Sequence, residues 1–287
     1  MLLCACGGGS GSSSASSSTT DVGHEQAAEL NAPDTSSSGV ATIQAASPTL
    51  PSNTTSVPSA PGASQVVFSG RTWEVRSSPE RGGPRSNLFD AKNVWVDSRG
   101  FLHLKISQAD GVWSAAELYT TERLGFGRYQ FKILGHPETM DKSIVFGLFN
   151  YPTEDVGVDG TNEIDIEFAT WGGAQTVHGN WSVWPAVPGV DYTHKAYDAA
   201  LNTDQSTHRF VWSKKSVIFQ SLRGQSDTSK GLYRQWTFAP RDFSTRIPQA
   251  AMPLHMNLWI YSDSATPVPS DGKEREIVVT EFKYTPL

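Results

Sequence analysis

The sequence after residue 64 breaks into short apolar segments separated by turn residues. Over 126–133 apolar and polar residues alternate, which is the period of a half-buried β-strand. Segment 143–149 is a continuous apolar run, as in a strand that is covered on both faces. Segments 93–106 and 210–219 each hold two such runs around a short turn, so both indicate β-hairpins. Because no long segment has the 3.6-residue period of a helix, these features predict an all-β fold, a sandwich or jelly roll.

The first 64 residues differ in composition from the rest of the chain. They are mainly Ser, Ala, Thr, Gly and Pro, and they contain no Lys, Arg or aromatic residue. Such a segment cannot bury enough apolar surface to offset the entropy lost on ordering, so it is predicted to be disordered. We therefore divide the chain into a tether, residues 1–64, and one folded domain, residues 65–287, which is long enough for a single large core.

Both cysteines of the chain, Cys4 and Cys6, lie at its start. The segment Leu-Cys-Ala-Cys over 3–6, followed by glycines, resembles the end of a bacterial lipoprotein signal in which Cys6 is lipidated. The basic region and most of the apolar region of such a signal are missing, so the signal would be truncated; the alternative is a disordered start with two idle cysteines. A low-complexity tether before a folded domain is consistent with export. The expected location is therefore extracytoplasmic, either secreted or lipid-anchored at the bacterial cell surface.

The net charge of the chain is −6, and four of the acids lie in the tether, so the folded domain carries about −2. This balance lacks the basic face that nucleic acids need, and it gives no attraction to an anionic membrane surface. A neutral, hydroxyl-rich partner such as a polysaccharide fits it better. The folded domain has no cysteine, which excludes disulfides and thiolate metal sites there, and it has no apolar run long enough for a transmembrane helix.

One predicted strand, Asn-Glu-Ile-Asp-Ile-Glu-Phe over 162–168, carries three acids. Because successive side chains of a strand point to opposite faces, Glu163, Asp165 and Glu167 share one face. The other face is apolar and would anchor the strand in the core. Acids are poor strand residues, and like charges in a row repel one another. The pattern leaves three interpretations open: a catalytic group, a solvated surface, and an oxygen-ligand site for a hard cation.

Catalysis would use these carboxyls as a general acid and a nucleophile. Crowding raises at least one pKa, so one carboxyl can stay protonated near neutral pH while a neighbour is ionised. Retaining glycosidases use such a pair at a separation of roughly 5–5.5 Å. The Cα atoms of Glu163 and Glu167 would lie about 13 Å apart on a flat strand. The two side chains can therefore cooperate only if the sheet is concave and they lean toward each other.

Segment 162–168 resembles the active-site strand of the family 16 glycoside hydrolases, which include lichenases, laminarinases and xyloglucan-active enzymes. Three further segments resemble landmarks of this family in the same order: 124–129, 256–259 and the ending 282–284. The resemblance covers the chain from about Val66 to its end. It implies an all-β jelly-roll sandwich of two curved antiparallel sheets with a concave substrate cleft.

The same resemblance assigns roles to the three acids. It implies a retaining double-displacement mechanism in which Glu163 is the nucleophile, Glu167 is the acid/base, and Asp165 tunes their protonation. The implied function is an endo-β-glucanase. The single residue between Asp165 and Glu167 matches the lichenase and xyloglucan branches, whereas 177–180, which contains His178, resembles the neighbouring strand of laminarinases. The predicted substrate is therefore a β-1,3-1,4-glucan or a β-1,3-glucan.

Candidate substrate-binding residues lie in or near these landmark segments. Sugars pack their C–H faces on aromatic rings and bond their hydroxyls to nearby amides. The candidates of these two kinds are Trp181, Trp184, Trp259, Asn87, Asn180 and Asn257. Asn87 begins an Asn-x-Phe segment that resembles a loop at the rim of the lichenase cleft. His178 is a further candidate, as a hydrogen-bond donor to the nucleophile or the sugar, and its alternative is a structural histidine.

The implied chemistry needs no cofactor. Many family members bind a structural calcium ion on the convex face through an acid of the terminal strand; Thr280 stands there in this sequence, with Glu281 beside it, so calcium is not favoured. The domain is expected to be a monomer whose partner is a β-glucan. Two other functions remain open: a transglycosylase or a xyloglucan- or galactan-active enzyme on the same fold, and a lectin-like module that binds glycan without cleaving it. The intact set of three acids argues against the lectin, because binding alone does not need crowded carboxylates.

Overall fold

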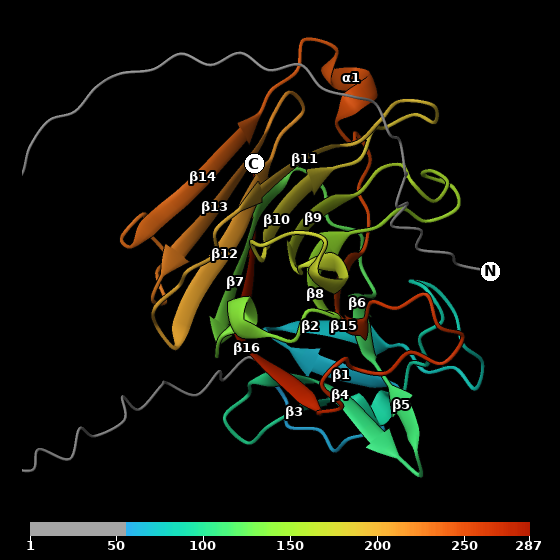
Figure 1. Cartoon of the computed structure of the whole chain (residues 1–287). Helices are drawn as coiled ribbons and strands as arrows, with labels where there is room; N and C mark the ends of the chain where they lie inside the picture. Colours follow the sequence, from blue (N-terminus) through green and yellow to red (C-terminus); the bar gives the residue numbers. More distant parts are fainter. Residues whose placement is uncertain (1–55) are drawn as a thin grey trace, which may run out of the picture. The chain divides into compact units, whose positions relative to one another are not determined.

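The structure, a computed structural model, describes residues 56–287 (Figure 1). In this part of the chain the strands form two eight-stranded antiparallel sheets. Sheet A has the strand order β1-β2-β6-β15-β8-β9-β10-β11. Sheet B has the order β14-β13-β12-β7-β16-β4-β3, with β5 paired to β4. The predicted all-β sandwich is thereby confirmed.

The strands are short, as the spacing of turn residues predicted. Sheet A consists of β1 (Gln65–Phe68), β2 (Arg71–Val75), β6 (Ala116–Thr120), β8 (Ile144–Asn150), β9 (Ile164–Phe168), β10 (Gly179–Val183), β11 (Thr193–Tyr197) and β15 (Leu254–Ile260). Sheet B consists of β3 (Val94–Val96), β4 (Leu102–Ala109), β5 (Val112–Ser114), β7 (Gly127–Leu134), β12 (Gln205–Trp212), β13 (Val217–Arg223), β14 (Leu232–Phe238) and β16 (Arg275–Pro286). The helical elements are η1 (Ala91–Asn93), η2 (Pro137–Thr139), η3 (Trp171–Gly173) and α1 (Phe243–Arg246). Among the described residues no helix has the length and apolar character needed to span a membrane.

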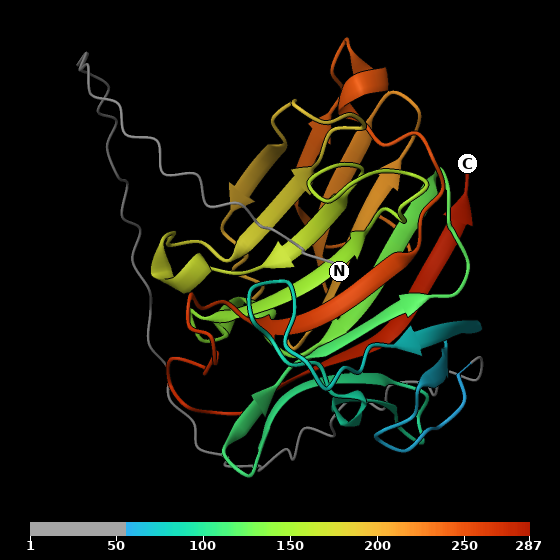
Figure 2. The same ribbon diagram turned by 90° about the vertical axis from the view of Figure 1, so that its right-hand side faces the viewer.

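The two sheets pack face to face around one hydrophobic core, and Figure 2 shows both of them curved. Strand alternation supplies this core: on β9, Ile164, Ile166 and Phe168 are fully buried in it. Strand β8 is buried along its whole length. Its continuous apolar sequence predicted this, because the core covers one of its faces and side chains of the outer face cover the other.

Both predicted hairpins are present. Strands β3 and β4 pair antiparallel around a short turn, and so do β12 and β13. The C-terminal strand β16 lies inside sheet B between β4 and β7, so the end of the chain is part of the fold. Local alternation identified these strands, whereas their neighbours in the sheets depend on contacts far apart in the sequence.

The packed part of the chain begins before the predicted boundary at residue 65. The amide of Val57 donates to the carbonyl of Val67 at 2.9 Å, and the amide of Ser59 donates to the carbonyl of Val96 at 2.9 Å. Segment 56–64 therefore lies against the sandwich rather than in the tether. The rest of the predicted tether and the predicted lipid anchor at Cys6 lie outside the described residues, so these and the extracytoplasmic location stay predictions.

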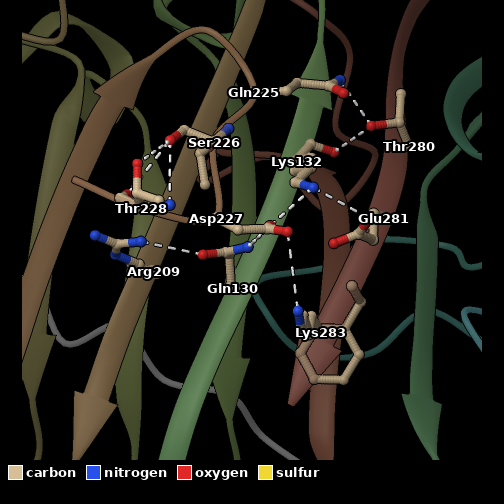
Figure 3. Close-up of polar contacts among 12 residues, drawn as sticks. Gln130, Lys132, Arg209, Gln225, Ser226, Asp227, Thr228, Thr280, Glu281 and Lys283 are labelled. Atoms are coloured by element: carbon tan, nitrogen blue, oxygen red, sulfur yellow. Dashed lines mark hydrogen bonds and ion pairs between the residues drawn. The ribbon is translucent and has the colours of Figure 1, made fainter. Parts of the chain in front are cut away.

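A polar cluster lies on the outer face of sheet B (Figure 3). The ammonium group of Lys132 on β7 is 2.9 Å from Asp227 Oδ1 and 3.1 Å from Glu281 Oε2. Asp227 belongs to the loop between β13 and β14, so Lys132 connects three separate elements. Thr280 Oγ1 accepts a hydrogen bond from Gln225 and donates one to the carbonyl of Lys132. Because the acids beside Thr280 already bind an ammonium group, this arrangement does not fit a divalent cation, and the absence of calcium stays a prediction.

The ion pairs of Lys132 are expected to contribute modestly to the stability of the fold. Replacing Lys132 by Met is expected to lower the free energy of unfolding by about 1 kcal/mol, because its partners Asp227 and Glu281 remain partly exposed and solvated. For a domain of this size the melting temperature would fall by roughly 2–4 °C, more at low salt. The matched control is Lys283→Met, since Lys283 lies 3.9 Å from Asp227 and is more exposed. Equal melting temperatures for Lys132→Met and Lys283→Met would contradict the expected contribution of Lys132 to stability.

Candidate active site

Asp165 and Glu167 lie on β9 and Glu163 directly precedes it; β9 pairs antiparallel with β8 on one side and with β10 on the other. The chain enters β9 through Asn162, which has a left-handed φ of 53° and whose side-chain amide donates to the carbonyl of Ala186 at 3.2 Å. The carbonyl of Glu163 accepts a hydrogen bond from the amide of Trp184 at 2.8 Å. Glu163 is thus fixed by the sheet, although it precedes the first residue of the strand.

The acid face of β9 points away from the core, but it is not open to solvent. Glu163 is 7% exposed, Asp165 is 3% exposed, and Glu167 is partly buried. This burial excludes the interpretation of a solvated surface. Within residues 56–287 no group of three or more His, Cys, Asp or Glu side chains is arranged to hold a metal ion. Of the three interpretations, the placement favours a catalytic group.

Burial raises the pKa of all three carboxyls, and the charges of neighbouring acids add to this for Glu163 and Glu167. Burial is the main cause of the strongly raised pKa of Glu163, and the charges of Asp165, Glu167 and Asp159 add to it. Burial likewise raises the pKa of Asp165 to about 7, against the lowering effect of its hydrogen bonds. The pKa of Glu167 is raised well above its usual range by burial and by the charge of Asp165. The group therefore keeps protons near neutral pH and can offer an acid and a carboxylate together.

Trp184, directly after β10, lies beside the carboxylates. Its indole Nε1 donates to Asp165 Oδ2 at 2.9 Å. Its ring stacks on the ring of Tyr192, with centroids 4.4 Å apart and an interplanar angle of 14°. The structure thus places this predicted site residue in direct contact with the acid face.

On the β8 side, the outer face of sheet A continues to a buried ion cluster. The register pairs Asp165 with Phe149, and Phe149 with His255 on β15. Glu117 on β6 is 5% exposed; its Oε1 lies 3.0 Å from His255 Nδ1 and its Oε2 lies 2.6 Å from Arg76 Nη1. Burial opposes ionisation of Glu117, but the hydrogen bonds and charges of His255 and Arg76 outweigh it and lower its pKa. Glu117 is therefore ionised near neutral pH.

A cavity of about 720 Å³ opens over this cluster. Tyr119, Tyr151 and His255 line it with their rings; the His255 ring lies 5.1 Å from that of Tyr119 and 5.7 Å from that of Tyr151. Arg76 and Glu117 add charged hydrogen-bonding groups to the lining. Aromatic faces combined with a few fixed polar groups are typical of carbohydrate-binding pockets.

Sequence patterns did not identify Arg76, Glu117 and His255 as site residues. A signal for His255 was present, because it stands two residues before Asn257 and therefore shares its face of the strand. No local pattern brings these residues together, since they come from three segments that only the sheet order makes neighbours.

Asn257 lies on the acid side of sheet A, opposite Gly147 on β8. It is 4% exposed, and its Oδ1 has no hydrogen-bond partner among the described residues. A Cβ atom at position 147 would lie 2.5 Å from this oxygen, so the glycine makes room for the amide. A buried acceptor without a donor is costly, which marks this amide as a candidate contact for a substrate hydroxyl.

Two of the predicted sugar-binding tryptophans are covered by protein. Trp181 pairs with Ile166 and so faces the core, where it is 1% exposed and stacks on Tyr197 at 4.0 Å. Trp259 is on the acid side but is also 1% exposed, beneath Trp171 and Tyr261. Neither ring offers a face to a sugar, so the predictions for Trp181 and Trp259 are wrong. For Trp181 the cause is that a one-residue step along a strand reverses the face, whereas Trp259 is on the predicted face but is covered by neighbouring rings.

The predicted amides Asn87 and Asn180 are used by the protein itself. Asn87 is 1% exposed and bonds both the amide and the carbonyl of Ile260, which fixes the loop after β2 to β15. Asn180 donates to the carbonyls of Ala169 and His178, and it accepts from Gln175. Both amides therefore hold loops in place, and their binding of substrate stays a prediction.

His178 is partly buried and directly precedes β10. The register of β10 against β9 places it on the face of the sheet that carries Glu167, because Gly179 pairs with Phe168. Its carbonyl accepts from the amide of Ala169 at 2.8 Å. Both the donor role and the structural role remain compatible with this place.

No protein-family model matches the sequence, and no curated protein matches it. The fold is similar to that of a Bacillus licheniformis β-glucanase (TM-score 0.56, 21% identity, 81% of this chain and 98% of the other). It is also similar to a β-1,3-glucanase from Mycobacterium marinum (TM-score 0.57, 17% identity, 82% and 94%). A third similar structure is a Bacteroides ovatus mixed-linkage glucan GH16 protein in complex with a G4G4G3G product (TM-score 0.56, 11% identity, 74% and 94%). At these identities the likeness shows a shared jelly-roll fold, which nearly the whole of each of the three chains adopts.

Proposed function

We propose that this protein is a retaining glycoside hydrolase of the family 16 type that cleaves internal glycosidic bonds of a β-glucan. The observation that carries the proposal is the group of Glu163, Asp165 and Glu167 on one face of the sheet, in which Glu163 and Asp165 are buried and Glu167 is partly buried. Such a group is costly to bury, and a merely structural strand has no use for three carboxyls with raised pKa values. The folds of the similar glucanases support the same conclusion.

The first step forms a covalent intermediate. The carboxylate of Glu163 attacks the anomeric carbon, the glycosidic C–O bond breaks, and Glu167 gives its proton to the leaving oxygen. In the second step Glu167, now ionised, takes a proton from water, whose oxygen attacks the anomeric carbon and releases Glu163. Two inversions give net retention of configuration. The raised pKa of Glu167 keeps this carboxyl protonated for the first step.

The cavity beside the carboxylates supports a polymeric substrate. It is lined by Tyr119, Tyr151 and His255 and lies on the β6–β15 side of β9, so bound sugar units would extend from the reacting bond across sheet A. Neutral glucan units need hydrogen bonds and ring faces rather than a net countercharge. The cluster of Arg76, Glu117 and His255 provides the hydrogen bonds, and within it the charge of Glu117 compensates that of Arg76. We propose β-1,3-1,4- or β-1,3-glucan as the substrate.

The proposed function is tested by incubating the protein with barley β-glucan, laminarin, xyloglucan, agarose and carrageenan. Release of new reducing ends from barley β-glucan or laminarin, with proton NMR showing the β-anomer as the first product, is the expected result. Oligosaccharides longer than the substrate would identify a transglycosylase. Binding to one polymer without cleavage of any would overturn the hydrolase and leave a lectin-like module.

A prediction for the cavity follows from its aromatic lining. Replacing Tyr119 by Ala is expected to raise KM for the polymer about five- to tenfold, as removal of a stacking ring typically costs. kcat should change less than about twofold, since the ring is remote from the reacting carboxyls. The matched control is Tyr233→Ala, a partly buried tyrosine on β14 of the other sheet, which should leave KM unchanged. Equal KM values for the wild type and Tyr119→Ala would exclude the cavity as part of the binding site.

A further inference from the structure

Asp165 occupies the centre of the acid face, and its side chain is surrounded by hydrogen-bond donors. The indole Nε1 of Trp184 donates to its Oδ2 at 2.9 Å. A hydrogen bond from the side chain of Ser182 also stabilises its charged form, and so does one from Glu163 for as long as Glu163 keeps its proton. An indole N–H can only donate, so it requires an acceptor at Oδ2 in every protonation state. A proton on Asp165 is therefore favoured on the other oxygen, Oδ1, since a carboxylate or carbonyl oxygen accepts better than a hydroxyl oxygen.

The orientation of Trp184 is fixed from several directions. Its backbone amide donates to the carbonyl of Glu163, which sets the register beside the acid strand. The face of its ring stacks on Tyr192, and Tyr192 stacks in turn on His194 of β11, with centroids 5.3 Å apart. One ring face and the N–H edge of Trp184 are thus already used by the protein. This is more constraint than a ring that serves only as a surface for sugar would need.

We propose that Trp184 is a positioning residue of the reaction: its indole N–H stabilises negative charge on Asp165 and so favours the active protonation state of the three carboxyls. In that state Glu163 and Asp165 are ionised and Glu167 is protonated. The expected change in kcat/KM rests on the proposed function, whereas the effect of Trp184 on the protonation of Asp165 does not. It assigns Trp184 a role through Asp165, in place of the expected role as a sugar-stacking ring.

The direction of the effect follows from linkage. A donor that stabilises the ionised form lowers the pH at which the Glu163–Asp165 pair gives up protons. Without the indole N–H, Asp165 ionises less readily, so the acidic limb of the kcat/KM profile moves to higher pH. The ionised Asp165 also raises the pKa of Glu167. When less of Asp165 is ionised, the pKa of Glu167 falls, so the basic limb of the kcat/KM profile moves to lower pH. The profile therefore narrows from both sides.

The test is the pH profile of kcat/KM for Trp184→Phe, which keeps an aromatic ring for Tyr192 and removes the N–H. The acidic limb is expected to move up by about one pH unit, the size of one charge-assisted hydrogen bond. Trp171→Phe is the matched control, because Trp171 is a partly exposed tryptophan of the same sheet region with no hydrogen bond to the three carboxyls. Ser182→Ala removes a second donor to Asp165 and should move the limb in the same direction as Trp184→Phe.

Carboxyl carbon NMR gives a second readout that needs neither substrate nor activity. The Asp165 resonance, assigned by its loss in Asp165→Asn, should titrate at higher pH in Trp184→Phe than in the wild type, with circular dichroism confirming that the variant is folded. A rise in KM with unchanged pH limbs and an unchanged Asp165 titration would overturn the proposal and leave Trp184 as a sugar-stacking ring. An inactive wild type would overturn the proposed function alone, because the NMR titration still decides the effect on Asp165.

Discussion

Replacing Glu163 by Gln is expected to lower kcat/KM on the preferred glucan by roughly a thousandfold or more, since a covalent nucleophile is lost. The amide has nearly the same shape as the carboxylate and keeps the backbone bond that holds residue 163 against Trp184. KM should change much less than kcat, because the cavity residues are untouched. The measurement is the rate at which the wild type and Glu163→Gln release reducing ends from the same glucan. Retention of more than about a tenth of the activity would exclude Glu163 as the nucleophile.

The same variant should be more stable than the wild type at neutral pH, and this separates loss of chemistry from loss of fold. The folded-state pKa of Glu163 is raised by burial and by neighbouring acids. A carboxyl of this kind destabilises the folded state as pH rises above its unfolded pKa of about 4.3. Gln carries no such charge, so the melting temperature should exceed that of the wild type above this pH. The exposed Glu80→Gln is the control, with unchanged activity and stability.

The strand with the acids was predictable because its pattern is entirely local. Alternation put Glu163, Asp165 and Glu167 on one face and the apolar residues on the other, and the structure has this arrangement. The sequence predicted neither their burial nor the environment of the acid face, because both come from strands β8 and β10 and from the loops that follow them. Crowded acids can be predicted from one strand, whereas their shifted pKa values require the whole sheet.

The error at Trp181 has a local physical cause. Residues that neighbour a landmark segment in the sequence need not face the cleft, because a strand presents alternate residues to opposite sides. Trp181 is one residue from the acid side and lies in the core as a result. The amides of Asn87 and Asn180 hydrogen-bond backbone groups of loops and so hold these loops in place. Asn257 differs from them, because its side-chain oxygen has no hydrogen-bond partner within residues 56–287 and so can accept a bond from a ligand.

Replacing Glu167 by Ala is expected to reduce activity on the natural glucan by about a hundred- to ten-thousandfold, as loss of a general acid does. The effect should depend on the leaving group. An aryl β-glucoside whose phenol leaves without protonation needs no help in the first step, so its burst of phenol should persist in the variant. The second step then becomes rate-limiting, because no base remains to activate water. Rapid-mixing measurement of phenol release checks this separation of the two steps.

Azide distinguishes the roles of the two glutamates by stereochemistry. In Glu167→Ala the small anion can enter the space left by the side chain and attack the glycosyl–Glu163 ester without a base, which restores turnover and gives the β-glycosyl azide. In Glu163→Ala azide would instead replace the nucleophile itself and give the α-glycosyl azide by a single inversion. The opposite pair of products would exchange the two roles. Because both residues lie on the same face of β9 on either side of Asp165, the anomeric configuration assigns each role where the fold alone does not.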